Sequence, residues 1–423
     1  MKGFRASLLR FVAGDELERI DDALVVVDRG LIVDAGDRGA LARRHPGVEI
    51  VDWRGLLIAP GFIDTHVHFA QVDAIASLAD GLLQWLERCT FPQEARFGDP
   101  EHACVVADFF LDELARNGVT SAMVWCTSHL ASTEAFFAAS ARRGLRMIAG
   151  KCLMDRNSPA TVCDDTERGL AQTEALIGRW HGRDRLGYAI TPRFAPACSE
   201  RQLRGVAELA RAREDVWLQS HLAETREEVA WVARLFPGSR SYLDVYDRLG
   251  LLRPRSVYAH CIHLDDADRV RMRESGASAA VCPNSNLFLG SGLFDFAAAA
   301  RTRISWALAS DVGAGPSLSP FRTMLAAYEV ARLAGVSLTP GLLWHRHTLG
   351  AARALDLADR VGNVAAGMEA DFVALDPRAT ALLARRSASA ASLDELLFSM
   401  IVLGDDRVVR HTVIAGEPAV RAG

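Results

Sequence analysis

Between about residues 56 and 355, apolar runs alternate with amphipathic stretches along the chain. The runs are almost continuously apolar, which is typical of parallel strands covered by helices. Eight of them occur, at residues 56–68, 119–126, 146–153, 186–194, 216–224, 256–264, 278–286 and 304–313. The stretches between them predict helices, and one is expected to begin at Asp99-Pro100-Glu101 and end at Gly118, because these residues favour helix ends. Eight strand–helix units in about 300 residues predict a closed (β/α)8 TIM-like barrel, an α/β fold.

The two ends of the chain have a different pattern. Short apolar segments between turns predict strands at residues 23–27 and 31–35 near the start, and at 371–375 and 407–414 near the end. For the middle of the chain, an open doubly wound sheet is the alternative fold. However, no glycine-rich phosphate-binding turn follows the first apolar run, so the closed barrel is favoured.

Composition narrows the possible functions. The chain has 423 residues, of which 50% are hydrophobic and 24% are charged, so it is too apolar for a disordered protein and long enough for a large core. With 48 basic against 53 acidic residues it has no basic excess, and we expect no nucleic-acid partner. We find no apolar run of about eighteen residues and no signal-peptide core, so we expect a cytoplasmic protein with no membrane partner. The eight cysteines form no CxxC pair and are expected to be reduced thiols.

Several apolar runs end in a polar or ionisable side chain. In (β/α)8 barrels the catalytic groups lie at the C-terminal ends of the strands, so these side chains are expected to meet at one face of the barrel. They are His66, His68, Arg193, His221, His260 and Asp311.

The first of these groups is His66-Val67-His68. Residues i and i+2 of a strand point to the same face, so both imidazoles converge there, and neutral imidazoles suit zinc or iron. A second pair of this spacing, His345-Arg346-His347, falls in a helix-like stretch, where i and i+2 point far apart. We interpret that second pair as structural or surface residues.

Three later strand ends complete the predicted metal site. His221 offers a third nitrogen, and Glu224, just past the same strand, is placed to exchange a proton with a metal-bound water. Strand eight neighbours strand one in a closed barrel, so Asp311 is expected beside the first histidine pair. His260 ends the sixth run, next to His221, and is placed to hydrogen-bond the nucleophile.

The segment Pro60-Gly61-Phe62-Ile63-Asp64-Thr65-His66-Val67-His68, together with His221, His260 and Asp311, resembles the amidohydrolase superfamily. A narrower resemblance, to the guanine deaminase family, rests on further segments spread over most of the predicted barrel. These are residues 84–97, 154–157, 191–196, 242–246, 282–292 and 310–315.

The chain departs from the guanine deaminase pattern at four places. Cys89 replaces a usual Tyr, Ser220 a usual Thr and Cys261 a usual Gly. Phe69-Ala70-Gln71 stands where Ala-Pro-Gln is frequent. The last change borders the expected substrate pocket, so it leaves the exact purine open.

The resemblance implies a fold, a reaction and an assembly. A small β-sandwich, made of residues 1–58 and 365–423, is expected to accompany the barrel of residues 59–364. The implied reaction is the zinc-dependent hydrolysis of guanine to xanthine and ammonia, in purine catabolism. A homodimer is also implied.

The resemblance further implies the roles of the site residues. One Zn2+ per subunit is expected, with Fe2+ as an alternative, and Glu224, His260 and Asp311 are expected to act in catalysis. Arg193 offers a rigid fork of donors, Phe194 a ring face and Gln71 both donors and an acceptor for a flat base. The implied metal ligands are His66, His68, His221 and Asp311, and the implied substrate-binding residues are His68, Gln71, Arg193, Phe194, His221, Glu224 and Asp311.

Three other functions are weighed against this one. A binuclear amidohydrolase commonly carries a carboxylated lysine on strand four, but the fourth run has no lysine, and Lys151 lies in the third. A deaminase of a related base (8-oxoguanine, a pterin or an aminotriazine) would use the same chemistry. A non-catalytic scaffold has no need for three converging histidines together with Glu224 and Asp311.

Overall fold

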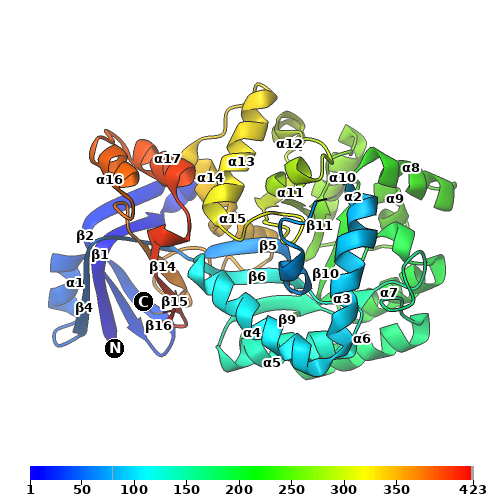
Figure 1. The fold of residues 1–423 in the computed structure, drawn as a ribbon. Helices are drawn as coiled ribbons and strands as arrows, with labels where there is room; N and C mark the ends of the chain where they lie inside the picture. Colours follow the sequence, from blue (N-terminus) through cyan, green and yellow to red (C-terminus); the bar gives the residue numbers. More distant parts are fainter. Residues whose placement is uncertain (79, 421–423) are drawn as a thin grey trace.

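A parallel-stranded barrel and a smaller β-domain lie side by side in the computed structural model, which describes residues 1–78 and 80–420 (Figure 1). The barrel strands pair in parallel in the order β5-β6-β7-β9-β10-β11-β12-β13, and the short β8 (Cys152–Leu153) follows β7 and pairs with β9. Each strand falls inside one of the eight predicted runs, so the predicted barrel is confirmed. The bounds are β5 (Phe62–His68), β6 (Val119–Trp125), β7 (Arg146–Gly150), β9 (Gly187–Pro192), β10 (Trp217–Leu222), β11 (Ser256–His260), β12 (Ser278–Val281) and β13 (Ser305–Leu308).

The barrel closes between its last and first strands through separate backbone hydrogen bonds. The amide of His68 donates to Val312 O at 2.7 Å, and the amide of Asp311 donates to His66 O at 3.0 Å. The chain that leaves β13 is thus hydrogen-bonded along the C-terminal half of β5. As the closed-barrel prediction required, this brings Asp311 beside the histidine pair.

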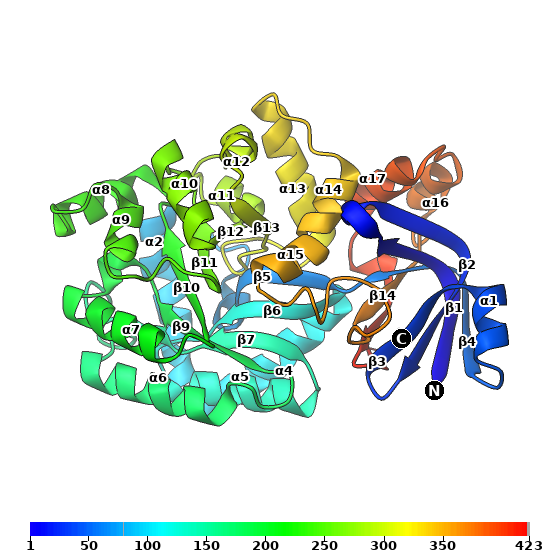
Figure 2. The ribbon, with the colours of Figure 1, turned by 180° about the vertical axis from the view of Figure 1, so that it is seen from behind.

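Helices surround the barrel strands, as the two opposite views show (Figures 1 and 2). The helix α4 begins as predicted, because the Asp99 carboxylate accepts from the amide of Glu101, and Gly118, at φ +78°, follows its end. The outer helices of eight or more residues are α4 (Pro100–Arg116), α5 (Leu130–Arg142), α6 (Thr166–Trp180), α7 (Glu200–Ala212), α8 (Arg226–Leu235), α10 (Asp266–Ser275) and α13 (Pro320–Leu333). Shorter ones are α2 (Leu82–Trp85), α3 (Phe91–Ala95), α9 (Tyr242–Asp247), α11 (Pro283–Phe288), α12 (Phe296–Thr302), α14 (Pro340–Arg346) and α15 (Leu349–Ala354).

Strands from both ends of the chain form a seven-stranded sheet in the order β16-β15-β14-β4-β1-β2-β3. The predicted joining of the two ends is confirmed, whereas the exact domain boundaries stay a prediction. The sheet strands are β1 (Lys2–Phe11), β2 (Leu17–Asp28), β3 (Leu31–Asp37), β4 (Glu49–Pro60), β14 (Phe372–Leu375), β15 (Val409–Ile414) and β16 (Glu417–Val420). The helices α1 (Arg38–Arg44), α16 (Ala381–Ala388) and α17 (Leu393–Leu403) complete this part of the chain.

The first predicted run divides between the two sheets. Residues up to Pro60 belong to β4 and pair with β14, whereas the barrel strand begins at Phe62. Gly61 lies at the crossing, where a Cβ atom would come within 2.2 Å of Thr120 Oγ1. Because both parts of the run are buried and apolar, the hydrophobic pattern alone contains no sign of this crossing.

The second histidine pair lies at the end of α14, away from the other histidines. His347 is buried and hydrogen-bonds Ile63 O through Nδ1 at 3.1 Å, while His345 lies 3.4 Å from the Asp15 carboxylate. Each ring therefore has a structural contact, as predicted.

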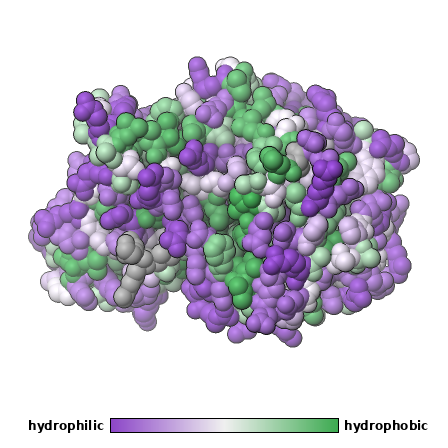
Figure 3. Space-filling view, in the orientation of Figure 1, coloured by the Kyte–Doolittle hydropathy of each residue, from purple (hydrophilic) through white to green (hydrophobic). Residues whose placement is uncertain are grey.

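On the face in Figure 3, hydrophilic residues cover most of the surface, and hydrophobic residues gather over the middle and at the upper left. Among the described residues, no helix is long and apolar enough to cross a membrane. All eight cysteines are free thiols.

A half-buried ion network joins the barrel to the segment that leads into β14. Glu369 accepts hydrogen bonds from Arg146 and Arg185, and Arg185 also pairs with Asp371. Burial alone would raise the pKa of Glu369, but the hydrogen bonds and charges of the two arginines hold it below its ordinary value. The network therefore stabilises the ionised carboxylate in the folded state.

We expect Glu369→Gln to lower the free energy of unfolding by about 2–4 kcal/mol, because it leaves two partly buried guanidinium groups without their shared anion. Thermal and urea unfolding measure the change. The wild-type contribution is complete above about pH 5 and is lost as the pH falls through the lowered pKa of the folded state, so the difference between the two proteins should shrink in acid. Glu417→Gln, at the exposed pair with Lys2, is the control and should change little. Equal stability of both variants at pH 7 would contradict the role of the network.

Candidate active site

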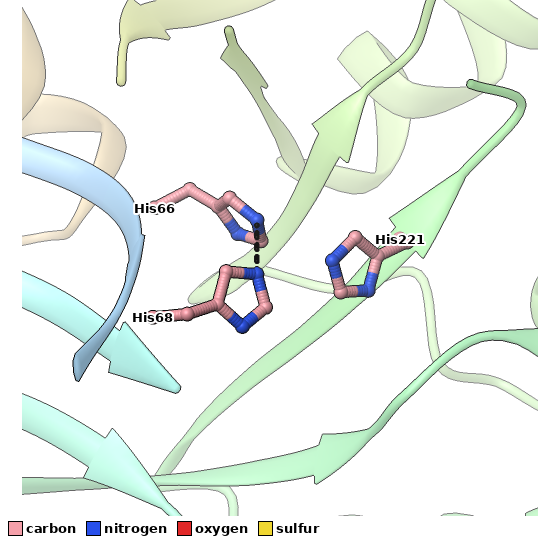
Figure 4. A group of neighbouring side chains, drawn as sticks. All are labelled: His66, His68 and His221. Carbon is pink, nitrogen blue, oxygen red and sulfur yellow. Dashed lines mark hydrogen bonds between the residues drawn. The ribbon is translucent and has the colours of Figure 1, made fainter. Parts of the chain in front are cut away.

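The polar side chains predicted at the strand ends meet at the C-terminal mouth of the barrel. His66 and His68 come from β5 and His221 from β10, and Figure 4 shows their three imidazoles turned toward one another. His260 ends β11, while Glu224 and Asp311 lie just beyond the ends of β10 and β13. Six residues from four strands, far apart in the sequence, thus surround one point.

The distances among these side chains fit a metal ion. His66 Nε2 and His68 Nε2 are 3.1 Å apart, and Asp311 Oδ1 lies 3.1 Å from the first and 3.3 Å from the second. Four ligands placed tetrahedrally at about 2.0–2.1 Å from zinc lie about 3.3 Å from one another, in agreement with these values. His221 belongs to the same group, and His260 forms an overlapping group with His66 and Asp311.

The orientation of the histidine ligands is fixed by their surroundings. His221 Nδ1 donates to the carbonyl oxygen of Arg193 at 2.6 Å, so its Nε2 is left with the lone pair that a metal needs. Burial lowers the pKa of His68 to about 4, and that of His221 well below its usual range. Although burial opposes it, hydrogen bonds from His66 and His68 hold the pKa of Asp311 well below normal. Neutral imidazoles and an ionised carboxylate are the protonation states required for metal binding.

Asp64 links β5 to the segment that follows β13, the two segments that carry His66, His68 and Asp311. Its buried carboxylate accepts hydrogen bonds from the amide of His66 at 3.2 Å and from the amide of Ser310 at 3.1 Å, and also from the Ser310 hydroxyl. Because Ser310 precedes Asp311, this one carboxylate sets the relative position of ligands from the first and last strands.

Backbone strain is concentrated at this mouth. Ala223, His260, Cys261 and Asp311 are all non-glycine residues at positive φ, between 52° and 72°. Such conformations cost about 1–3 kcal/mol each and persist where the surrounding structure holds them. The usual Gly at position 261 would adopt this conformation without strain, and here a buried Cys takes its place.

Glu224 is fully buried beside the predicted ligands. Its Oε1 accepts from Ser291 Oγ at 2.8 Å, and its Oε2 lies 3.3 Å from His260 Nε2. Burial and the charge of Asp311 raise its pKa to about 8. A carboxyl group in this environment can both accept and return a proton near neutral pH. On the far side of the imidazole, His260 Nδ1 lies 2.9 Å from Asn286 Oδ1, which holds the ring in place.

The first turn of α8 anchors the backbone of Glu224. Thr225 and Glu228 form a capping box, and Glu228 Oε2 also accepts from the amide of Glu224 at 2.8 Å. The other oxygen of Glu228 accepts from Tyr242 OH at 2.8 Å. The buried second carboxylate therefore fixes the position of Glu224.

A pocket opens beside the metal-binding group, and the predicted substrate residues Gln71, Arg193 and Phe194 all line it. Arg193 and Gln71 hydrogen-bond the buried carboxylate of Glu94, and Phe194 is buried with its ring 6.1 Å from that of Trp231. Besides Glu228, apolar side chains form the rest of the wall, so the pocket suits a flat, partly polar ring. These are Leu82, Trp85, Leu86, Leu289 and Ala314.

Several residues that complete the site cannot be recognised from the sequence alone. Glu94, Ser291 and Asn286 lie in segments that resemble the family, but they stand in helices or loops, where no strand periodicity directs them toward the barrel axis. Thr225 followed by Glu228 three residues later is the sequence pattern of a capping box at a helix start. That pattern predicts the cap but not the contact of Glu228 with Glu224. Only the tertiary structure shows that these side chains hydrogen-bond the residues of the site.

Comparison with known proteins places the chain in a family. Residues 57–419 match the profile of the amidohydrolase family. The chain is 40% identical to the guanine deaminase of Escherichia coli over 412 residues, which cover 97% of this chain and 92% of that protein. The chain belongs to the amidohydrolase family, in its guanine deaminase group. The predictions of family and of a metal-dependent hydrolase are therefore confirmed.

Solved structures of this group share the whole fold. The E. coli guanine deaminase structure superimposes with a TM-score of 0.98 at 38% identity and covers 100% of both chains. A guanine deaminase from C. acetobutylicum with guanine bound in its active site has a TM-score of 0.91 at 28% identity, over 99% of each chain. The likeness extends over the barrel and the β-domain alike.

Ser291→Ala is expected to lower kcat about tenfold to a hundredfold, because Glu224 loses a hydrogen bond of the kind made to charged groups. KM and metal content should stay the same, since Ser291 contacts neither the predicted metal ligands nor the base-facing side chains. Steady-state kinetics with metal analysis checks this, and Ser389→Ala, at an exposed serine, is the control. An unchanged kcat in Ser291→Ala would show that this hydrogen bond does not matter for turnover.

Proposed function

We propose that this site hydrolyses guanine to xanthine and ammonia. The observation that carries the proposal is a single pocket that holds both a metal-binding group with an adjacent buried carboxyl, Glu224, and the polar pair Gln71 and Arg193. The guanine deaminase of E. coli is 40% identical over 97% of this chain, and the similar guanine deaminase of C. acetobutylicum holds guanine in its active site. These similarities support the choice of guanine among amino-bearing rings.

The proposed cofactor is one Zn2+ per subunit, held by His66, His68, His221 and Asp311. Three imidazole nitrogens and one carboxylate oxygen suit zinc, and Fe2+ is the alternative that metal analysis distinguishes. When bound, such an ion lowers the pKa of a water ligand toward about 7.

The side chains of this protein perform the proton transfers. Glu224 accepts a proton from the attacking water while the oxygen of that water bonds to the amino-bearing ring carbon. Glu224 then passes that proton to the adjacent ring nitrogen, takes the second water proton, and delivers it to the departing amino group, which leaves as ammonia. His260, held by Asn286, orients the water by hydrogen bonding. The ring carbon thus gains a bond to the water oxygen and loses its bond to the amino nitrogen, and both water protons are accounted for.

The base is proposed to lie between Phe194 and the apolar wall, with its polar edge toward Arg193 and Gln71. Arg193 has only donors, so it matches the carbonyl oxygen and ring nitrogen acceptors of guanine. The carbon that carries the amino group is then the part of the ring nearest Glu224.

A binuclear site receives no support from the fourth barrel strand. No lysine occurs in β9, and Lys151, between β7 and β8, forms a buried ion pair with Asp164. The ammonium of Lys151 is thus already paired, in agreement with one metal per subunit.

We also propose that the chain acts as a homodimer in the cytoplasm. The free cysteines agree with a reducing compartment. Mass measurement in solution tests the assembly.

The reaction itself is tested by incubating the zinc-loaded protein with guanine in water enriched in 18O. The proposal requires ammonia and xanthine in equal amounts, with one labelled oxygen per xanthine. A protein that binds zinc but forms no labelled xanthine would refute it.

A further inference from the structure

Glu94 is a buried carboxylate that no step of the proposed reaction uses. It lies in α3 (Phe91–Ala95), part of the segment that covers the pocket, and it is only 2% exposed. Three hydrogen bonds reach it: Arg193 Nη1 donates to Oε2 at 2.6 Å, Arg193 Nη2 to Oε1 at 3.0 Å, and Gln71 Nε2 to Oε1 at 2.8 Å. One carboxylate thus holds both polar side chains proposed to face the base.

The ion pair fixes the position and charge of Arg193. Two parallel N–H···O bonds hold the guanidinium plane against Glu94, and the ring of Phe91 lies 5.2 Å from its central carbon. Although burial opposes it, the charge of Arg193 keeps the pKa of Glu94 below its ordinary value, so the pair is ionic. Arg193 also lines the pocket, and any N–H group that it turns toward a ligand can meet only an acceptor atom.

The same carboxylate fixes the orientation of the Gln71 amide. An ionised carboxylate is an acceptor only, so it selects the Nε2 end of the amide, and Gln71 Oε1 is left 3.4 Å from the amide nitrogen of Gly313. Without the negative charge, the amide could turn by half a rotation and exchange its donor and acceptor. Glu94 therefore sets the hydrogen-bonding pattern of two residues at once.

We propose that Glu94 is a positioning residue that makes the pocket select rings with a carbonyl oxygen over rings with an amino group at the edge facing Arg193. This inference rests on the proposed function and specifies its substrate class: guanine is accepted and 2,6-diaminopurine is rejected. The two compounds share the 2-amino group that is removed. They differ at position 6, where guanine has a carbonyl oxygen and 2,6-diaminopurine an amino group, and at the adjacent N1, which carries a hydrogen in guanine only. A fixed cation matches the oxygen of the first compound and opposes the amino hydrogens of the second.

The test compares Glu94→Gln with wild type on these two substrates. A site built to hydrogen-bond one group rejects analogues strongly, so wild type should prefer guanine by at least about 10²-fold in kcat/KM. In Glu94→Gln that ratio should fall at least tenfold, and KM for guanine should rise more than kcat falls. The affinity for xanthine, which has no amino group to lose, should weaken at least tenfold by calorimetry, with metal content unchanged.

Glu87→Gln is the matched control, because it makes the same chemical change at an exposed site of the same covering segment. If Glu94→Gln fails to fold, Glu94→Asp decides the question, since it keeps the charge but withdraws the carboxylate by one methylene, and it should also reduce the ratio. A ratio and a xanthine affinity within twofold of wild type in a folded Glu94 variant would overturn the inference. Wild-type ammonia release from guanine reports separately on the proposed function.

Discussion

Glu224→Gln is expected to reduce kcat for guanine by about 10³–10⁴-fold, in the upper part of the range of about 10²–10⁴-fold that general acid–base groups supply. Glutamine keeps the shape of the side chain and its contacts with Ser291 and His260, but it cannot accept the proton of the attacking water. Metal content should stay at the wild-type level, because Glu224 is not among the proposed ligands. Steady-state ammonia release together with metal analysis measures both quantities.

Glu227→Gln is the control for this experiment, because Glu227 lies three residues further along the chain and is exposed. It should retain wild-type kinetics. A Glu224→Gln protein that turned over guanine at a near-normal rate with its metal in place would remove Glu224 from the mechanism.

Asp311→Asn is expected to damage both metal retention and turnover. The Asp311 carboxylate lies within 3.3 Å of Nε2 of both His66 and His68 and supplies the only negative charge in the proposed ligand set. Loss of a residue that merely supports a ligand costs about 10–100-fold in metal affinity, so the loss of this ligand should cost at least about 10²-fold. Zinc titration against a competing chelator gives the affinity, and ammonia release gives the rate.

The two effects of Asp311→Asn can be separated by adding zinc. Excess metal should refill the site but restore only part of the rate, since the remaining amide is a poorer acceptor for the attacking water. Asp359→Asn, at an exposed carboxylate, is the control and should behave as wild type. Full zinc affinity together with full activity in Asp311→Asn would contradict the assigned ligand set.

The barrel was predictable because its strands are buried on both faces and therefore form apolar runs. For the same reason, the sequence did not predict where the chain crosses from β4 to β5, because the residues directly before and after Gly61 are equally buried. The positions of the strand ends predicted which histidines converge. Side chains alternate in direction along β5, and the closed barrel brings the ends of its strands to one face. Closure also predicted the approach of Asp311 to His66 from more than two hundred residues away.

The hydrophobic pattern of the sequence could not predict the residues that act from loops and short helices. Glu94 meets Arg193 across 99 positions of sequence, through a covering segment of short helical turns with no regular period. Ser291 reaches Glu224 from the loop after α11, and its side chain has no chemistry that distinguishes it from other serines. Their roles follow only from the distances that the folded chain creates.

We propose that this pocket deaminates guanine in preference to related rings. The most direct measurement is kcat/KM for ammonia release by the zinc-loaded protein from guanine, 8-oxoguanine, isoxanthopterin and ammeline under the same conditions. We expect the highest value for guanine. If guanine is inert while another of these rings is turned over, the metal site and Glu224 keep their roles, but the reading of the pocket formed by Gln71, Arg193 and Phe194 is contradicted.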